Sequence, residues 1–176
     1  MATPFDVKIV TPERILFSGE AEEVSLRTTD GEIAFLAHHE DFIGALDITV
    51  VRVTTSDASA SAPAGPGASG SEGVGELRLA VAGGFVHVDQ DANSVTILAG
   101  VAELASEIDV ARANRALESA EAAASDRSTP DAPVGDEVGG AEPSPAAVIL
   151  LDPESPEAAV KRARVRLEAA GATPTA

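Results

Sequence analysis

The sequence contains no cysteine, no tryptophan and no tyrosine, and only 5 of its 176 residues are phenylalanine. Without cysteine the chain can form no disulfide, bind no metal through thiolates and offer no cysteine nucleophile. Hydrophobic residues still make up 44% of the chain, which is enough for a folded core. We therefore expect a core built from valine, isoleucine, leucine and alanine.

Basic residues are also scarce. Lys and Arg together number 12 against 29 Asp and Glu, which gives a formal net charge of −17. Because binding to a phosphate backbone depends on neutralising it with cations, this balance argues against a nucleic-acid partner. The longest apolar run, Ala146–Leu151, falls far short of the ~18 residues that a membrane span needs. We expect any membrane association to come through partner proteins.

Short segments with the alternating pattern of half-buried strands fill the first third of the chain. Gly19-Glu20 and Asp30-Gly31 are typical of turns, and 37–41 of a polar loop. Many short strands with such closely spaced turns indicate an antiparallel sandwich or barrel. The predicted strands cover residues 5–9, 15–17, 24–28, 32–36, 42–46 and 48–53.

A segment rich in Ser, Ala, Gly and Pro, residues 54–75, interrupts the strand pattern. Such a composition buries too little to offset its ordering entropy, so we predict a flexible insertion. Glu76–Val81 should pair across it with Ile48–Val53, and Gly83-Gly84 should form a bulge or a bend. The remaining strand pattern covers 85–88 and 95–98, with a turn at 89–93 and an end to the sheet near Ala102.

Helix-forming composition follows the strands. Ser106-Glu-Ile-Asp109 has the form of a capping box, which predicts the start of a helix that runs to about Ser125. Because its apolar stripe is mostly alanine, this helix should bury little area and dock weakly. The stripe consists of Ile108, Ala113, Leu117, Ala120 and Ala124.

A second helix is clearly signalled near the end of the chain. Ser155 is suited to the N-cap, Pro156 to the first turn and Gly171 to the position just past the end. A basic cluster, unusual in this acidic protein, lies along it together with a narrow apolar stripe. The cluster consists of Lys161, Arg162, Arg164 and Arg166, and the stripe of Val160, Ala163 and Leu167.

The acidic segment between the two helices is rich in Pro and Gly, which predicts a second disordered insertion. Its apolar island Ala146–Leu151 is either a stray strand or a partner-binding segment. The chain thus divides into a β domain, a first helix, a linker and a second helix. The predicted boundaries are 1–104, 105–125, 126–153 and 154–172.

Three motifs carry little chemistry in their context. Gly65–Gly70 matches G-x-G-x-x-G but lies in a low-complexity loop without the strand and helix that phosphate binding needs. Asp89–Asn93 opens like a calcium loop but lacks the later Gly and Glu. His38-His39-Glu40-Asp41, even with His87, supplies no full metal-ligand spacing. Nucleophile motifs are also missing, so we expect no catalytic residues and no metal site.

The most suggestive stretch is Glu103–Ala113, at the joint between strands and helices. Asp109 and Arg112 begin a helix, whose free N–H groups and dipole favour an anion. Arg112 could meet a phosphate or carboxylate, and Glu103 could accept bonds from a base or ribose. The alternative interpretation is a capped helix with a local Arg–Glu pair.

The order of several short motifs points to a known family. Phe17–Glu20 and Gly31–Ile33 precede Val81–Val86, and Val95–Leu98 then leads to Ala102-Glu103 and Ile108–Ala113. Taken together, these motifs resemble the epsilon subunit of bacterial F-type ATP synthase. The likeness covers residues 5–125 apart from the 54–75 insertion, and the helix after 155 fits the family's second C-terminal helix in character.

This resemblance implies an N-terminal antiparallel β-sandwich followed by a two-helix C-terminal domain. It implies a non-catalytic subunit of the central rotor stalk, which couples proton-driven rotation of the c-ring to ATP synthesis. The implied partners are the gamma subunit, the c-ring and, through the helices, the catalytic alpha/beta head. The protein would then sit at the cytoplasmic face of the bacterial cell membrane. The loops at Gly31, Glu32, His38 and His39 match the end that faces the ring.

In some bacterial members of that family, ATP favours a folded helical pair, whereas an extended pair inhibits ATP hydrolysis. The resemblance therefore implies a regulatory ATP site and an inhibitory basic helix, with no cofactor required. Ser119 stands where ATP-binding members carry a further arginine. The implied ATP-site residues are Glu103, Ile108, Asp109, Arg112 and Ala113, and the basic helix is the one with Lys161, Arg162, Arg164 and Arg166.

A different class of function also fits the residues. A free-standing β-sandwich that binds a ligand and carries a disordered acidic tail would show the same strand pattern and composition. Co-purification with a gamma subunit separates the two hypotheses, because only a rotor subunit should be retained.

Overall fold

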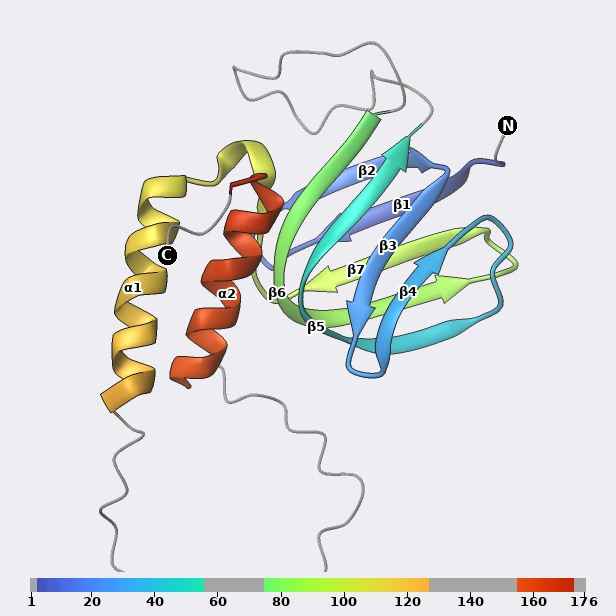
Figure 1. Ribbon diagram of the computed structural model, residues 1–176. Coiled ribbons are helices and arrows are strands. Elements are labelled where there is room, and N and C mark those ends of the chain that lie inside the picture. The colour runs from blue at the N-terminus through green and yellow to red at the C-terminus, as the bar shows by residue number, and fades with distance from the viewer. Residues whose placement is uncertain (1–2, 56–74, 127–154, 173–176) are drawn as a thin grey trace, which may run out of the picture.

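A computed structural model describes residues 3–55, 75–126 and 155–172, which form a β-sandwich and two helices (Figure 1). The strands are β1 (Phe5–Val10), β2 (Ile15–Ala21), β3 (Glu23–Thr28), β4 (Gly31–Phe35), β5 (Phe42–Thr55), β6 (Gly75–Asp89), β7 (Ser94–Ala99) and β8 (Ala102–Leu104). A 3₁₀ turn, η1 (Ala105–Glu107), leads to helices α1 (Val110–Asp126) and α2 (Pro156–Ala169). The predicted fold class is confirmed.

Hydrogen bonding connects the strands in the order β2-β1-β7-β6-β5-β3-β4, with β8 paired to β6. All described pairs are antiparallel except β1 with β7. The predicted alternation appears directly in β1, where Phe5, Val7 and Ile9 are buried and their neighbours are not. These side chains join an aliphatic core with only three phenylalanines buried in it, as the composition requires.

The central hairpin of β5 and β6 spans both layers of the sandwich. On β6 the core-facing residues are Leu79 and Val81 in the first half but Val86 and Val88 in the second. The buried positions thus change parity, from odd-numbered to even-numbered residues. The change occurs at Gly83-Gly84, whose φ angles are 78° and 138°. Pairing with β5 keeps one register throughout, so both strands bend together. The sequence predicted either a bulge or a bend at Gly83-Gly84, and the structure has a bend there.

Two strand predictions are wrong. Gly19-Glu20 is not a turn, because it lies inside β2 with Gly19 opposite Val7 of β1. The segments 42–46 and 48–53 are not two strands, because β5 runs unbroken through Asp47. In both cases continuous pairing with a neighbouring strand outweighs the local turn tendency of a glycine or an aspartate. The predicted pairing of 76–81 with 48–53 is confirmed.

The helix signals are partly correct. Ser155 caps α2 by accepting a hydrogen bond from the Ala158 N–H at 3.1 Å, and Gly171 follows the last turn with φ 68°. The predicted capping box at Ser106 is wrong, because Ser106 lies in η1 and α1 begins four residues later. Asp109 caps α1 instead.

Helix α2 lies between α1 and the sandwich (Figure 1). Leu117 and Ala113 of α1 pack with Leu167 and Ala163 of α2 in a second, smaller core. The insertions predicted within 54–75 and 126–153 fall almost entirely outside the described residues. So do the glycine motif 65–70 and the apolar island 146–151.

Candidate functional site

Glu103, at the end of the sheet, is the centre of the candidate site. Its carboxylate accepts hydrogen bonds from Arg166 of α2, with Nη2 at 2.9 Å and Nε at 3.2 Å. Arg112 of α1 approaches the other oxygen at 3.9 Å. The Glu103 and Arg166 side chains are 24% and 28% exposed, whereas Arg112 is 66% exposed. One carboxylate thus joins the sheet to both helices.

Asp109 holds the start of α1 close to this cluster. Its Oδ1 accepts a hydrogen bond from the Arg112 N–H at 2.9 Å. This backbone bond is the main reason why the pKa of Asp109 lies below its usual value, with a further contribution from the Ala111 N–H. The capped helix and local Arg–Glu pair considered from the sequence are therefore both present.

The other two residues of the predicted ATP site have a packing role in this conformation. Ile108 and Ala113 are 9% and 3% exposed and belong to the helical core. The crevice beside Glu103 and Arg166 has a volume of only about 10 Å³, which is room for about one water molecule. A nucleotide would therefore have to meet the exposed Arg112 side chain or displace α2.

All four basic residues of α2 are engaged within the chain. Lys161 pairs with Asp47 at 2.5 Å, Arg164 with Glu121 at 2.8 Å and Arg166 with Glu103. Arg162 also has an interaction partner. In this conformation Lys161, Arg164 and Arg166 are therefore paired with carboxylates of the chain itself.

A second contact at the joint between the sandwich and the helices was not predicted from the sequence. Arg14, between β1 and β2, makes a two-pronged ion pair with Glu107 of η1, and one of the two hydrogen bonds measures 3.1 Å. The bond to Glu107 raises the pKa of Arg14. The sequence carries no signal for this pair, because its partners are 93 residues apart. It holds the segment before α1 against the sandwich.

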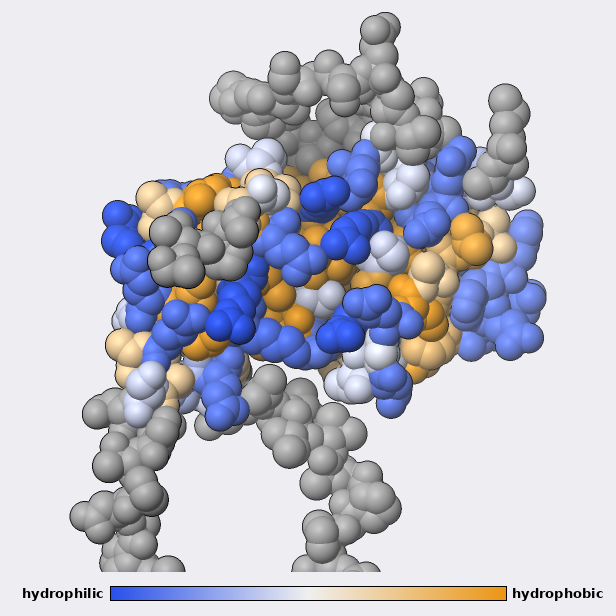
Figure 2. Space-filling view, in the orientation of Figure 1, coloured by the Kyte–Doolittle hydropathy of each residue, from blue (hydrophilic) through white to orange (hydrophobic). Residues whose placement is uncertain are grey.

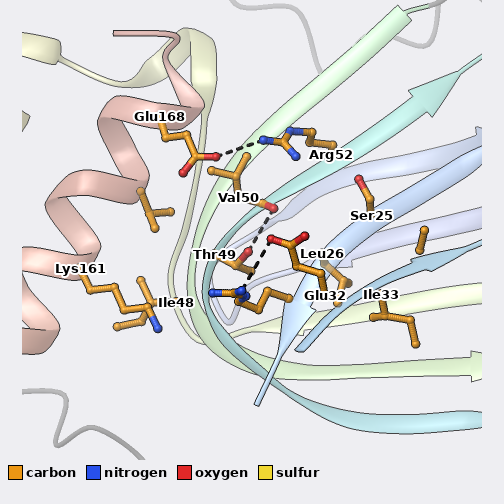
Figure 3. A pocket seen from close by; sticks show the side chains of 13 residues that line it. Ser25, Leu26, Glu32, Ile33, Ile48, Thr49, Val50, Arg52, Lys161 and Glu168 are labelled. Atoms are coloured by element: carbon orange, nitrogen blue, oxygen red, sulfur yellow. Dashed lines mark hydrogen bonds and ion pairs between the residues drawn. The ribbon is translucent and has the colours of Figure 1, made fainter. Parts of the chain in front are cut away.

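A groove of about 490 Å³ opens between α2 and the β3–β4 hairpin. Figure 3 shows Lys161 and Glu168 of α2 on one side, Glu32 and Ile33 on the other, and residues of β5 between them. The groove lies where the pairing of β3 with β5 is interrupted between Ser25 and Thr28. Hydrophilic and apolar side chains alternate over this part of the surface (Figure 2).

The residues predicted to face a c-ring lie at opposite ends of β4. Gly31 and Glu32 begin this five-residue strand, and His38 and His39 follow its end. His38 has φ 60°, and its N–H donates to Asn93 Oδ1 at 2.8 Å. The His39 ring stacks edge-on against Phe35, with 5.0 Å between the ring centroids. Of these two regions, the loop that contains His38 and His39 is thus the one that is hydrogen-bonded to the 89–93 turn.

An apolar stripe, which we define as Ile43, Phe85 and Leu98, crosses the outer face of the sandwich. These side chains are 75%, 60% and 52% exposed. Phe85 lies opposite Leu98 of β7 on one side and opposite Ala45, two residues from Ile43, on the other. The strand pattern placed these residues in strands but did not reveal that they face outward, because the parity change in the central hairpin decides it.

Within the described residues, no group of three or more His, Asp or Glu side chains is arranged to hold a metal ion. Neither of the two helices is long and apolar enough to cross a membrane.

Comparison with known proteins gives a consistent result. The family described as "ATP synthase, Delta/Epsilon chain, beta-sandwich domain" matches residues 4–64. The ATP synthase epsilon chain of Brevibacillus brevis is 41% identical over 115 residues, which covers 65% of this chain and 74% of the relative. That of Thermobifida fusca is 42% identical over 116 residues, or 65% and 73% of the two chains.

A solved structure shares the fold. A chain in the cryo-EM structure of Euglena gracilis mitochondrial ATP synthase, OSCP/F1/c-ring in rotational state 1, superposes with a TM-score of 0.54 and 21% identity. The match covers 96% of this chain and 78% of that chain.

Proposed function

Because this chain belongs to the family of ATP synthase epsilon chains, which are non-catalytic subunits, we propose that it is a rotor subunit of the central stalk. In this role the sandwich joins the gamma subunit to the c-ring, so that proton-driven rotation turns the stalk as a whole. The protein then meets the cytoplasmic face of the bacterial membrane only through the complex.

The observation that carries this proposal is the apolar stripe. Three large apolar side chains on neighbouring strands, each at least half exposed, are costly to leave in water. A rigid sheet also presents them at little cost in entropy on binding. We assign this surface to the gamma subunit, with Phe85 as its anchor, because exposed aromatic residues dominate the energetics of protein interfaces.

Co-purification with the gamma subunit tests this assignment. Phe85→Asp should lower the affinity for gamma by at least about tenfold, because it places a charge in an apolar interface. Ser18→Asp adds the same charge at an exposed position on β2 and should leave the affinity unchanged. Failure of the wild type to retain gamma would instead favour the free-standing ligand-binding module.

The two loops at the ends of β4 are our candidates for contact with the c-ring. Glu32 and His39 are the residues to test, because Glu32 lies at the start of β4 and His39 in the loop after its end. Cysteines introduced singly at these positions in the cysteine-free chain can be cross-linked to the ring. Cross-linking from both positions supports the proposal, and a ring contact from neither position contradicts it.

We also propose that ATP binds to this subunit and regulates it. Arg112 is the residue in the candidate site most available to a phosphate, because two thirds of its side chain is exposed. Calorimetric titration with ATP should show binding by the wild type and weaker binding by Arg112→Ala. Arg115→Ala removes a neighbouring exposed arginine of α1 and serves as the control. Equal binding by the wild type and Arg112→Ala would remove the site.

Inhibition of ATP hydrolysis is assigned to the basic face of α2. In the extended state, Lys161, Arg162, Arg164 and Arg166 would exchange their internal partners for acidic surfaces of the catalytic head. Since exposed pairs contribute only ~0–1 kcal/mol each, several must act together. Neutralising all four residues should relieve inhibition of hydrolysis in the assembled complex, and unchanged hydrolysis would count against this role.

A further inference from the structure

His87 lies on the outer face of the sandwich, beside the apolar stripe. It is two residues from Phe85 along β6, so both side chains point to the same face. Across the ladder it lies opposite Ile43 of β5, and side chains in such positions have Cβ atoms about 4.5–5.5 Å apart. All three side chains are exposed. A partner that covers Phe85 and Ile43 must therefore cover His87 as well.

The apolar surface continues on one side of His87. Phe85 lies opposite Leu98 of β7, Leu98 lies beside Val10 of β1, and Val10 lies opposite Ile15 of β2. Ile15 is 49% exposed and Leu98 is 52% exposed. His87 thus borders an apolar surface that runs across neighbouring strands from β2 to β5.

On the strand at its other side, His87 has an uncharged neighbour. Thr96 of β7 lies opposite it, and Lys8 of β1 lies beside Thr96. Since neighbouring strands are about 4.8 Å apart, the backbone of Lys8 lies about 10 Å from that of His87. Lys8 is exposed, so water and salt weaken its effect on the imidazole.

Two carboxylates lie on the side of His87 that faces the turn between β6 and β7. Asp89 follows His87 by two residues, and Asp41 immediately precedes β5. Asp41 Oδ1 accepts a hydrogen bond from the Gln90 N–H at 2.9 Å, and Asp89 Oδ1 accepts one from the Ala92 N–H at 2.8 Å. Both carboxylates are therefore engaged by backbone groups of the turn.

The charge of a histidine decides how readily the surface around it can be buried. Histidine is the side chain whose ordinary ionisation falls between about pH 5 and pH 8. A neutral imidazole can be covered by apolar groups at a smaller cost than an imidazolium ion, which loses its hydration without gaining a partner. Protonation therefore opposes the burial of Phe85 and Ile43 beside it.

We propose that His87 is part of the gamma-binding surface and that gamma binds the form of this subunit in which the imidazole is neutral. The affinity for gamma then falls as the pH falls through the range in which histidine ionises. This inference rests on the proposed function, because it takes the gamma subunit as the partner that covers the apolar stripe. It gives that interface a further residue and a pH dependence.

Calorimetric titration of the full-length chain with the complex of alpha, beta and gamma subunits tests this proposal. Because histidines ionise near pH 6.5, a requirement for the neutral form predicts an affinity roughly tenfold lower at about pH 5.5 than at about pH 7.5. Since other groups of both partners also titrate in this range, the comparison with variants decides the result. His87→Gln keeps a neutral polar side chain and should remove most of the pH dependence.

Two further variants sharpen the test. His87→Lys places a permanent charge beside the apolar stripe, so it should bind weakly at both pH values. His38→Asn removes an exposed histidine in the loop after β4, and asparagine suits the φ of 60° at that position. This control should keep the wild-type difference between the two pH values. Far-UV circular dichroism at both pH values checks that each variant is folded.

The outcomes separate this inference from the proposed function. Wild-type binding that is equally tight at the two pH values, or tighter at the acidic one, would overturn the role of His87 and leave the rotor assignment standing. The same conclusion follows if His87→Gln retains the full pH dependence of the wild type. If the wild type binds at neither pH, the assignment to the central stalk is itself refuted, and the role of His87 with it.

Discussion

Gly84 offers the sharpest test of how the central hairpin is built. A Cβ atom added at this position would lie 2.2 Å from the carbonyl oxygen of Leu98 and 2.9 Å from the Ala99 Cα. Both are backbone atoms of β7, so no side-chain rotation can relieve the clash. The backbone of Gly84 also has φ 138°, which residues other than glycine rarely adopt.

The expected cost of Gly84→Ala follows from two contributions. The positive φ costs about 1–2 kcal/mol. Relief of the clash requires β6 and β7 to move apart by about 1 Å or more, which sacrifices one or two ladder hydrogen bonds at about 1 kcal/mol each. The sum, about 2–4 kcal/mol, is a large part of the 5–15 kcal/mol that is usual for a domain.

Gly31→Ala is the matched control. Gly31 has nearly the same φ, 140°, but a Cβ there would meet no atom within 4 Å. It should therefore lose only the conformational part, about 1–2 kcal/mol. Urea unfolding followed by far-UV circular dichroism gives both values, since the chain has no Trp or Tyr for fluorescence. If Gly84→Ala is no less stable than Gly31→Ala, the close packing of β6 on β7 is not what requires glycine.

Three further predictions concern the helices. Ser155→Ala should weaken α2 by about 1 kcal/mol because it removes the N-cap bond, whereas Ser106→Ala should have no effect on helix content by circular dichroism. Leu167→Ala should cost the helical pair about 2–5 kcal/mol, measured as lost hydrogen-exchange protection in α1. The lowered pKa of Asp109 means that its cap supports α1 fully above the unfolded pKa of about 4 and fails as pH falls through the folded value. Protection of α1 should thus decline on acidification in the wild type, while Asp109→Asn should show no such titration.

Much of the fold could be predicted from local patterns. The alternation in β1 and the caps of α2 depend only on residues within a few positions of one another, and both are as predicted. The two errors in the strand predictions share one cause. Gly19 and Asp47 resemble turn residues locally, but their backbones are fixed by strands that lie far away in the sequence.

The candidate site divides in the same way. Asp109 and Arg112 are close because of the geometry of a helix start, which could be predicted from the sequence. Glu103 lies in β8, before the helix, so only its nearness in the sequence suggested that it would approach Arg112. Arg166 reaches the same carboxylate from 63 residues away, and Asp47 meets Lys161 across 114 residues. Both ion pairs depend on where α2 packs against the sandwich, which no local sequence pattern predicts.

The sequence by itself determined the aliphatic core, the strand-then-helix order, the excess of negative charge and the short motifs that identify the family. Only the tertiary structure decided which residues face outward in the apolar stripe and which carboxylates neutralise the basic helix. The reason is physical. Secondary-structure signals arise between residues that are near neighbours in the sequence. The parity change at Gly83-Gly84 and the packing of α2 against β5 depend instead on contacts that exist only once distant strands and helices have packed.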